Sequence, residues 1–235
     1  MKLWVGTSGY SYKAWLGNFY PERLAPKEML RFYASRLPAV EINNTFYRLP
    51  KESVLLSWAE QAPAEFRFVL KAPQKITHVK RLKDAETEVE YLFRVGKALG
   101  SNAGAVLFQL PPHLRKDIER LKTFLSLLPD DGAVAFEFRH PSWFDDELFA
   151  CLRARNCALC AAETDANDGS SLVATATWGY VRLRRSEYSR ADLLQWKEKI
   201  FSQQWDYAYI FFKHEDEGIG PKLAAEFLDV AGTTS

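Results

Sequence analysis

The sequence predicts an α/β fold, a single TIM-type (β/α)8 barrel that takes up residues 1–235. The length fits one barrel domain of about 200 to 250 residues, and eight short apolar runs alternate with helical patterns without a break in composition. Six of these runs end on polar residues, and in such a barrel the strand ends meet at one mouth. Those ends carry Glu41, Lys71, Gln109, Glu137 with Arg139, Arg182 and Lys213. An open doubly wound sheet is the alternative, but no glycine-rich dinucleotide fingerprint follows the first run.

The eight apolar runs are short and are bounded by loop residues, as expected of buried parallel strands. The expected strands are residues 2–6, 39–43, 66–71, 103–109, 133–138, 157–162, 179–183 and 207–212.

The segments between these runs repeat apolar residues at helical spacing. In residues 85–99, Val89, Leu92 and Phe93 share one face, and Gly100 follows as a stop signal. The other expected helices are 27–35, 52–61, 114–128, 144–155, 190–201 and 221–230. Residues 163–177 carry no such stripe, so we expect an irregular unit after the sixth strand.

Alternation along each strand predicts which side chains line the barrel. If Glu137 points inward, Ala133, Ala135 and Arg139 do so too, and residues 134, 136 and 138 face the helices. The same rule places apolar or aromatic residues below Glu41, Gln109 and Lys213, which leaves the polar groups at the rim. These residues are Ala39, Ala105, Leu107, Tyr209 and Phe211.

Composition and charge restrict the function classes. Lys plus Arg number 31 and Asp plus Glu number 30, so net charge gives no support to broad nucleic-acid binding. The apolar start MKLWV is too short for a signal peptide, and no stretch approaches a membrane span of about 20 residues. Three cysteines suit reduced thiols. We therefore expect a cytoplasmic protein without a membrane partner, and the oligomeric state stays open.

Six motifs, in order along almost the whole chain, resemble those of one family. They are GTSGYSYKAWLGNFYP, VEINNTFYRLP, FRFVLKAPQKITH, VLFQLPP, AFEFRHPSWF and FFKHEDEG. The chain is similar in these motifs to the YecE-like family, also known as domain of unknown function seventy-two. The resemblance implies a TIM-type barrel, and it implies no particular reaction or substrate. The KHED segment departs from the asparagine-rich versions of other members, so roles for Lys213 or His214 transfer less securely.

Carboxylates and a lysine at the strand ends are the candidate catalytic residues. Glu41 and Glu137 are expected to transfer protons, and Lys71 to stabilise negative charge, since two carboxylates in unequal surroundings serve as acid and base. Glu163 is a further candidate for the mouth. The alternative is that Glu137 is only neutralised, by Arg139 or Lys71, in a buried ion pair.

Cationic and polar residues at the same ends are expected to bind the substrate. Arginine offers a planar fork for two oxygens, which suits a phosphate or carboxylate group. His140 precedes a proline and could instead fix its loop. No metal or cofactor is expected, because no dense ligand motif is present and the cations would repel a divalent ion. The expected substrate-binding residues are Ser8, Asn43, His78, Gln109, Arg139, His140, Arg182 and Lys213.

Two functions remain open at this point. The first is a metal-independent hydrolase, lyase or isomerase that acts on an anionic small molecule. The second is a nucleic-acid-directed protein, a phosphodiesterase or a binder, which uses the basic loop 71–83 beside nearby aromatic residues. In a simpler interpretation the aromatic residues roof the barrel and the lysines are solvated.

Overall fold

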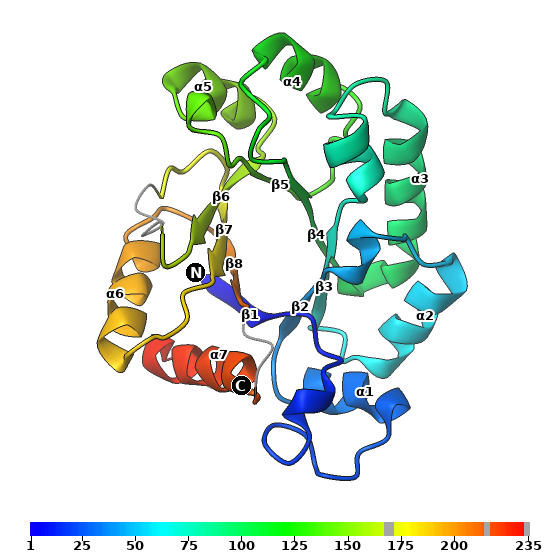
Figure 1. The fold of residues 1–235 in the computed structure, drawn as a ribbon, viewed down its shortest axis with the longest axis vertical. Helices are drawn as coiled ribbons and strands as arrows, with labels where there is room; N and C mark the ends of the chain where they lie inside the picture. The colour runs from blue at the N-terminus through cyan, green and yellow to red at the C-terminus, as the bar shows by residue number, and fades with distance from the viewer. Residues whose placement is uncertain (167–171, 214–216, 233–235) are drawn as a thin grey trace.

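Eight parallel strands close into a barrel in the order in which they occur in the chain (Figure 1). The computed structural model describes residues 1–166, 172–213 and 217–232. Strand β8 pairs back with β1, with Tyr209 opposite Trp4, so the expected TIM-type barrel is confirmed. The strands are β1 (Lys2–Ser8), β2 (Ala39–Ile42), β3 (Arg67–Lys71), β4 (Ala103–Gln109), β5 (Val134–Glu137), β6 (Ala158–Glu163), β7 (Trp178–Leu183) and β8 (Tyr207–Phe212).

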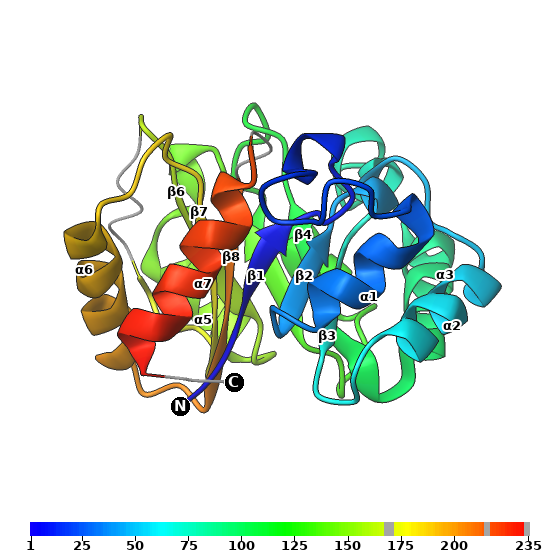
Figure 2. The same cartoon turned by 90° about the horizontal axis from the view of Figure 1, so that it is seen from below.

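The helices form a ring outside the barrel (Figures 1 and 2). They are α1 (Met29–Ala34), α2 (Glu52–Gln61), α3 (Glu86–Gly96), α4 (Ile118–Leu125), α5 (Asp146–Arg153), α6 (Arg190–Phe201) and α7 (Ile219–Ala231). Short turns of other helix types are η1 (Lys13–Trp15), η2 (Pro26–Glu28), η3 (Asn44–Phe46), η4 (Lys75–Val79), η5 (Lys97–Asn102) and η6 (Pro141–Trp143). The described residues between β6 and β7 contain no helix, as the sequence predicts for this unit; residues 167–171 lie outside the described part.

The expected alternation is confirmed on β5. Ala135 packs in the barrel interior with Trp4, Tyr180 and other inward side chains, whereas residues 134, 136 and 138 pack between the barrel and the helices. Glu137 therefore points inward at the carboxyl end of the strand. This alternation places the polar strand ends of the chain around one opening.

The helix expected at 114–128 is shorter than its apolar pattern. It begins after Asp117, whose Oδ1 accepts a hydrogen bond from the Arg120 N–H at 3.1 Å. An aspartate cap of this kind fixes where a helix starts. Leu114 is still buried, but in the loop before the helix.

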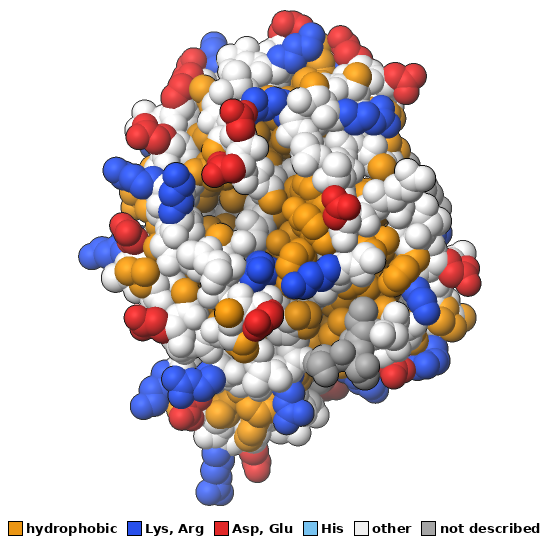
Figure 3. Space-filling model, turned by 180° about the vertical axis from the view of Figure 1, so that it is seen from behind, with side chains coloured by type: hydrophobic (Ala, Val, Ile, Leu, Met, Phe, Trp, Pro, Cys, Tyr) orange, Lys and Arg blue, Asp and Glu red, His pale blue; other side chains and the backbone are white. Residues whose placement is uncertain are grey.

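The amino-terminal end of the barrel has a different character from the mouth (Figure 3). Hydrophobic side chains gather there around a hollow of about 380 Å³, lined in part by Trp4, Tyr207 and Ala133. In TIM barrels, residues at this end serve stability and the opposite end carries function. The candidate site therefore lies at the opposite end of the barrel, at the carboxyl ends of the strands.

Candidate active site

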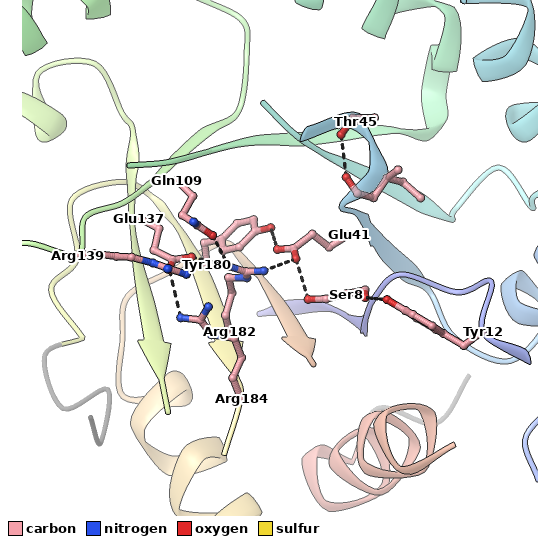
Figure 4. Close-up of polar contacts among 11 residues, drawn as sticks. Ser8, Tyr12, Glu41, Thr45, Gln109, Glu137, Arg139, Tyr180, Arg182 and Arg184 are labelled. Atoms are coloured by element: carbon pink, nitrogen blue, oxygen red, sulfur yellow. Dashed lines mark hydrogen bonds and ion pairs between the residues drawn. The ribbon is translucent and has the colours of Figure 1, made fainter. Parts of the chain in front are cut away.

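Arg182 on β7 stands at the centre of the polar cluster (Figure 4). Its side chain is 2% exposed, yet its guanidinium reaches carboxylates on two other strands. Nη2 donates to Glu41 Oε1 at 2.7 Å, and Nη1 donates to Glu137 Oε2 at 2.5 Å. A weaker bond at 3.3 Å joins Nη1 to Gln109 Oε1. One arginine thus links the ends of β2, β4 and β5 across the barrel.

Glu41 is completely buried and has three donors. Besides Arg182, Ser8 Oγ donates to Oε1 at 2.7 Å and Tyr180 Oη donates to Oε2 at 2.6 Å. Burial by itself raises the pKa of Glu41, but the Arg182 charge and the two hydroxyl groups outweigh it, so the pKa lies below its ordinary value. Glu41 is therefore a carboxylate, held in one orientation.

The backbone after Ser8 explains how β1 reaches this carboxylate. Gly9 has a φ of +100°, a conformation that favours glycine. Its N–H donates to the Glu41 carbonyl at 2.8 Å, while Tyr12 Oη donates to the Ser8 carbonyl at 2.8 Å. The turn that ends β1 therefore aims Ser8 at Glu41.

Glu137 is surrounded by arginines. Arg182 approaches one oxygen, and Arg139 Nε and Arg184 Nη2 donate to the other at 3.0 and 3.1 Å. Burial acts to raise the pKa of Glu137, but the charges of the three arginines hold it well below its ordinary value. The alternative interpretation of the sequence, a buried ion pair, describes this contact, although Lys71 forms no ion pair with it.

These ion pairs bear on the expected proton transfer by Glu41 and Glu137. A carboxylate whose pKa is strongly lowered is a weak base near neutral pH, because it gains little from binding a proton. The geometry favours a different role for both groups, which is to orient the arginines at the mouth. Side chains that exchange protons near neutral pH have pKa values closer to 7.

Lys71 is the first of these side chains. It ends β3 and is partly buried, and among the described residues its Nζ has no hydrogen-bonding or ion-pair partner. The amine lies 4.4 Å from the centre of the Phe46 ring. Burial and the charge of Arg182 lower the pKa of Lys71 to about 8, although Glu41 and Glu137 partly oppose this effect. An amine with this pKa exchanges protons at physiological pH.

His78 lies against the same phenylalanine. Its ring meets Phe46 edge to face, with ring centres 4.9 Å apart, and Nδ1 bonds with Thr77 Oγ1 at 2.8 Å. Burial and the charges of Lys71 and Arg139 lower the pKa of His78 below its ordinary value, so the imidazole is neutral at pH 7. His78 sits in a π-helical turn, Lys75–Val79, a geometry found frequently at functional sites.

Three expected binding residues lie beside the cluster rather than in it. His140 Nδ1 accepts from the Ser142 N–H at 3.1 Å and so caps a short helical turn, which is the loop-fixing role considered for it. Lys213 is exposed just past β8, and Asn43 lines a separate hollow of about 90 Å³. The Asn43 Oδ1 atom is buried and has no hydrogen-bond partner among the described residues. His214, considered with Lys213, lies outside the described residues.

The expectation that Glu163 lies at the mouth is wrong. Its side chain faces the helices, where Oε2 accepts from Trp196 Nε1 at 2.9 Å and from Tyr188 Oη at 2.6 Å. Glu163 occupies the outward position at the end of β6, opposite in parity to inward Cys160. It therefore stabilises the contact between the barrel and α6.

A family model matches almost the entire chain. The model described as "Protein of unknown function DUF72" covers residues 4–235. The chain belongs to the DUF72 family. This DUF72 protein is 33% identical over 144 residues to the UPF0759 protein YecE of Escherichia coli K12, a match that covers 60% of this chain and 50% of YecE. It is 29% identical over 155 residues to YunF of Bacillus subtilis, covering 63% of this chain and 54% of YunF. The chain thus spans about half the length of the curated relatives it matches.

Solved structures of DUF72 proteins share the fold. A DUF72 family protein from Thermotoga maritima superposes with a TM-score of 0.87 at 25% identity, covering 99% of this chain and all of the other. A DUF72 family protein from Enterococcus faecalis gives a TM-score of 0.79 at 18% identity, with 99% and 96% coverage. These matches agree with the closed eight-stranded barrel.

The polar cluster of this DUF72 protein contains Tyr180, which the sequence did not predict as a site residue. Tyr180 lies two residues before Arg182 on β7, so strand alternation points both side chains inward. Extending the period-two argument from Arg182 would have found it. Thr45 was also missed: its Oγ1 donates to the Lys71 carbonyl at 2.7 Å, which ties the loop carrying Phe46 to the end of β3.

Among its described residues, this DUF72 protein has no group of three or more His, Cys, Asp and Glu side chains that could hold a metal ion. Within the same described part, no helix is long and apolar enough to cross a membrane.

Proposed function

We propose that this DUF72 protein is an enzyme that acts on an anionic small molecule, one with a phosphate or carboxylate group, at the carboxyl end of its barrel. The observation that carries the proposal is an excess of positive charge. Of the described residues in the cluster, four are cationic and two are anionic: Lys71, Arg139, Arg182 and Arg184 against Glu41 and Glu137. Two positive charges remain, which matches a phosphate monoester dianion.

The cations differ in their availability to a ligand. Arg182 is held by both carboxylates, whereas the Arg139 side chain is 36% exposed and makes a single ion pair. The Nε atom of Arg184 is buried and has no acceptor among the described residues. The Nε of Arg182 is in the same state, but among the described residues Arg184 pairs with one carboxylate and Arg182 with two. Arg139 and Arg184 are therefore the proposed anion-binding residues, with Gln109 as a neutral neighbour.

The chemistry proposed for the site is metal-independent acid–base catalysis of the hydrolase, lyase or isomerase type. Lys71 has a pKa of about 8, so it can exchange protons near neutral pH, and His78 supplies a neutral imidazole whose pKa is lowered by burial and by the nearby cations. Both side chains lie against Phe46. Glu41 and Glu137 fix the arginines, so the charge of the site is preorganised before a substrate binds.

Ligand-induced thermal stabilisation tests the proposal. Glycerol phosphate at 100 times its dissociation constant should stabilise the protein by about 2.7 kcal/mol, which for a chain of this size raises the Tm by about 5 to 10 °C. Arg139→Gln should abolish the shift. Arg120→Gln is the matched control, because Arg120 is similarly exposed and pairs only with Asp117, on the outer helix α4. The proposal fails if phosphate and carboxylate ligands at millimolar concentration leave the wild-type Tm unchanged.

A second candidate, nucleic-acid binding, gains support from a hollow of about 480 Å³ beside the site. It is lined in part by Tyr47, Arg48 and Lys75, and the Tyr47 side chain is 74% exposed, as a base-stacking residue would be. Against this, Lys75 and Lys80 both pair with Glu88, at 2.8 and 2.7 Å, which reduces the positive charge of the loop.

Oligonucleotide binding separates the two candidates. Binding that weakens steeply with salt and is lost when Lys75, Lys80 and Arg81 are reversed in charge would favour the nucleic-acid function. If glycerol phosphate raises the Tm of the charge-reversed variants as much as that of the wild type, the small-molecule enzyme is favoured.

A further inference from the structure

Lys71 and His78 meet at one aromatic ring. The Lys71 amine lies over the face of Phe46 at 4.4 Å, and the His78 imidazole meets the same ring edge to face. Thr45, the residue before Phe46, bonds to the backbone carbonyls of Ile42 and Lys71. Thr45 therefore anchors the loop after β2, which places the Phe46 ring in contact with both the amine and the imidazole.

The state of Lys71 differs from that of the ion-paired lysines of this protein. Lys75 and Lys80 both pair with Glu88, and Lys116 pairs with Asp145. These carboxylates favour the protonated, unreactive form of the amines. The carboxylates whose charge acts on Lys71, Glu41 and Glu137, are ion-paired with arginines instead, so its amine lacks a hydrogen-bonded counter-ion among the described residues.

Cationic neighbours and partial burial are the conditions that activate a lysine as a nucleophile. Both are present at Lys71, because Arg182 and Arg139 lower its pKa and the side chain is partly buried. A lysine that serves only as a positive charge needs neither condition. The environment thus favours covalent chemistry over simple charge stabilisation.

We propose that the amine of Lys71 forms an imine with an aldehyde or ketone group of the anionic substrate, with His78 as the proton carrier. This inference rests on the proposed function and narrows its substrate class to phosphorylated or carboxylated carbonyl compounds. It also narrows the reaction class to lyase or isomerase chemistry at the carbon next to the carbonyl, since an imine withdraws electrons from that position.

The step balances without an outside reagent. The neutral Nζ attacks the carbonyl carbon, a C–N bond forms, and the π electrons of the C=O bond move to oxygen. The two protons of the amine are transferred to that oxygen, with the neutral imidazole of His78 accepting and returning them. The oxygen leaves as water, and a C=N bond remains, which water hydrolyses in the reverse direction.

Reductive trapping tests the imine. The protein is incubated with glycolaldehyde phosphate, reduced with borohydride, and analysed by intact mass and peptide mapping. Reduction of an imine adds the mass of the probe less one oxygen atom. We expect at least tenfold more adduct on Lys71 than on any other lysine, and competition by excess glycerol phosphate. An adduct spread over exposed lysines, without enrichment at Lys71, overturns the inference.

Two conservative variants separate the covalent role from a role in binding. Lys71→Arg keeps the positive charge but cannot form an imine, so it should retain stabilisation by glycerol phosphate and lose trapping at least tenfold. Lys75→Arg, in the same loop, should retain both. His78→Gln should slow trapping at least tenfold, with phosphate stabilisation unchanged.

The outcomes distinguish this inference from the proposed function. Phosphate stabilisation of the wild type without trapping overturns the imine and leaves the anion-directed enzyme standing. The absence of both overturns both. Because the adduct is mapped on the wild-type chain, the site of attachment is decided even if a variant fails to fold.

Discussion

Replacing Arg182 by methionine removes the only cation that is hydrogen-bonded to Glu41 among the described residues and leaves that carboxyl group fully buried. The hydroxyl groups of Ser8 and Tyr180 and the charge of Lys71 remain, but we expect burial, the largest influence on this group, to dominate and to raise the pKa of Glu41 above its ordinary value. Glu137 retains Arg139 and Arg184, so it stays ionised. We therefore expect Glu41 to be neutral in the folded variant at pH 7, whereas it is ionised in the unfolded chain at the same pH.

The free energy needed to neutralise Glu41 determines how much folding stability the variant loses. Protonating a carboxyl group of pKa about 4.3 at pH 7 costs about 3.7 kcal/mol, at 1.36 kcal/mol per pH unit. At pH 5 the same step costs about 1 kcal/mol. Wild-type Glu41 and Glu137 have lowered pKa values, so their contribution to stability is present above the unfolded pKa and is lost only as the pH falls below it. The loss of stability in Arg182→Met should therefore shrink from about 4 kcal/mol at pH 7 to about 1 kcal/mol at pH 5.

Urea unfolding followed by tryptophan fluorescence at both pH values measures this difference. Arg120→Met on the surface of α4 is the control and should cost at most about 0.5 kcal/mol, as for an exposed ion pair. Adding Glu41→Gln to Arg182→Met should remove the dependence on pH. A loss in Arg182→Met that is equal at pH 7 and pH 5, or smaller than about 1 kcal/mol at pH 7, would refute the central role of this arginine.

Three further predictions follow from single contacts. Tyr180→Phe removes a donor to buried Glu41 and should lower the free energy of unfolding by about 1 to 3 kcal/mol in urea titrations. Glu163→Gln should weaken the contact with Trp196 and lower the Tm, yet leave glycerol phosphate binding unchanged in calorimetry, because Glu163 lies outside the barrel. Acetylation of Lys71 by limiting acetic anhydride, followed by peptide mapping, should reach half its maximal rate near pH 8, whereas an ordinary lysine does so above pH 10.

The barrel could be predicted because its signals are local. Each strand is a short apolar run, and in the expected strand 133–138 the small residues Ala133 and Ala135 alternate with large ones, which reveals the inward face. On β6 both faces carry small or apolar residues, so the alternation gives no direction. The position of Glu163 could not be read for that reason, and the structure was needed to place it against α6.

The sequence predicted the central residues of the polar cluster, but it predicted neither Tyr180 nor the pairing within the cluster. Strand ends identify Glu41, Glu137 and Arg182 as neighbours at a mouth. Which arginine meets which carboxylate depends on the stagger of the strands and on side-chain length. The register that places Gln109 beside Glu137 is one such fact. Arg182 on β7 neutralises the carboxylates on β2 and β5. The sequence indicated only Arg139 and Lys71 as ion-pair partners of Glu137.

The arrangement also predicts opposite responses to pH for binding and for imine formation. Anion binding uses the positive charge of Lys71, so the affinity for glycerol phosphate, a dianion from pH 7.5 to 9.5, should fall as Lys71 loses its proton near pH 8. Two unit charges about 4 Å apart interact by about 1 kcal/mol even in water, which corresponds to about a fivefold loss.

Imine formation uses the neutral amine and should rise over the same interval, so turnover of a carbonyl substrate should be greatest near pH 8. Calorimetry at pH 7.5 and 9.5 measures the predicted change in affinity for glycerol phosphate. Lys71→Arg should bind equally at both, because arginine stays charged. If Lys71→Arg loses as much affinity between pH 7.5 and pH 9.5 as the wild type does, another group titrates in this interval. Lys71 would then not belong to the anion-binding site.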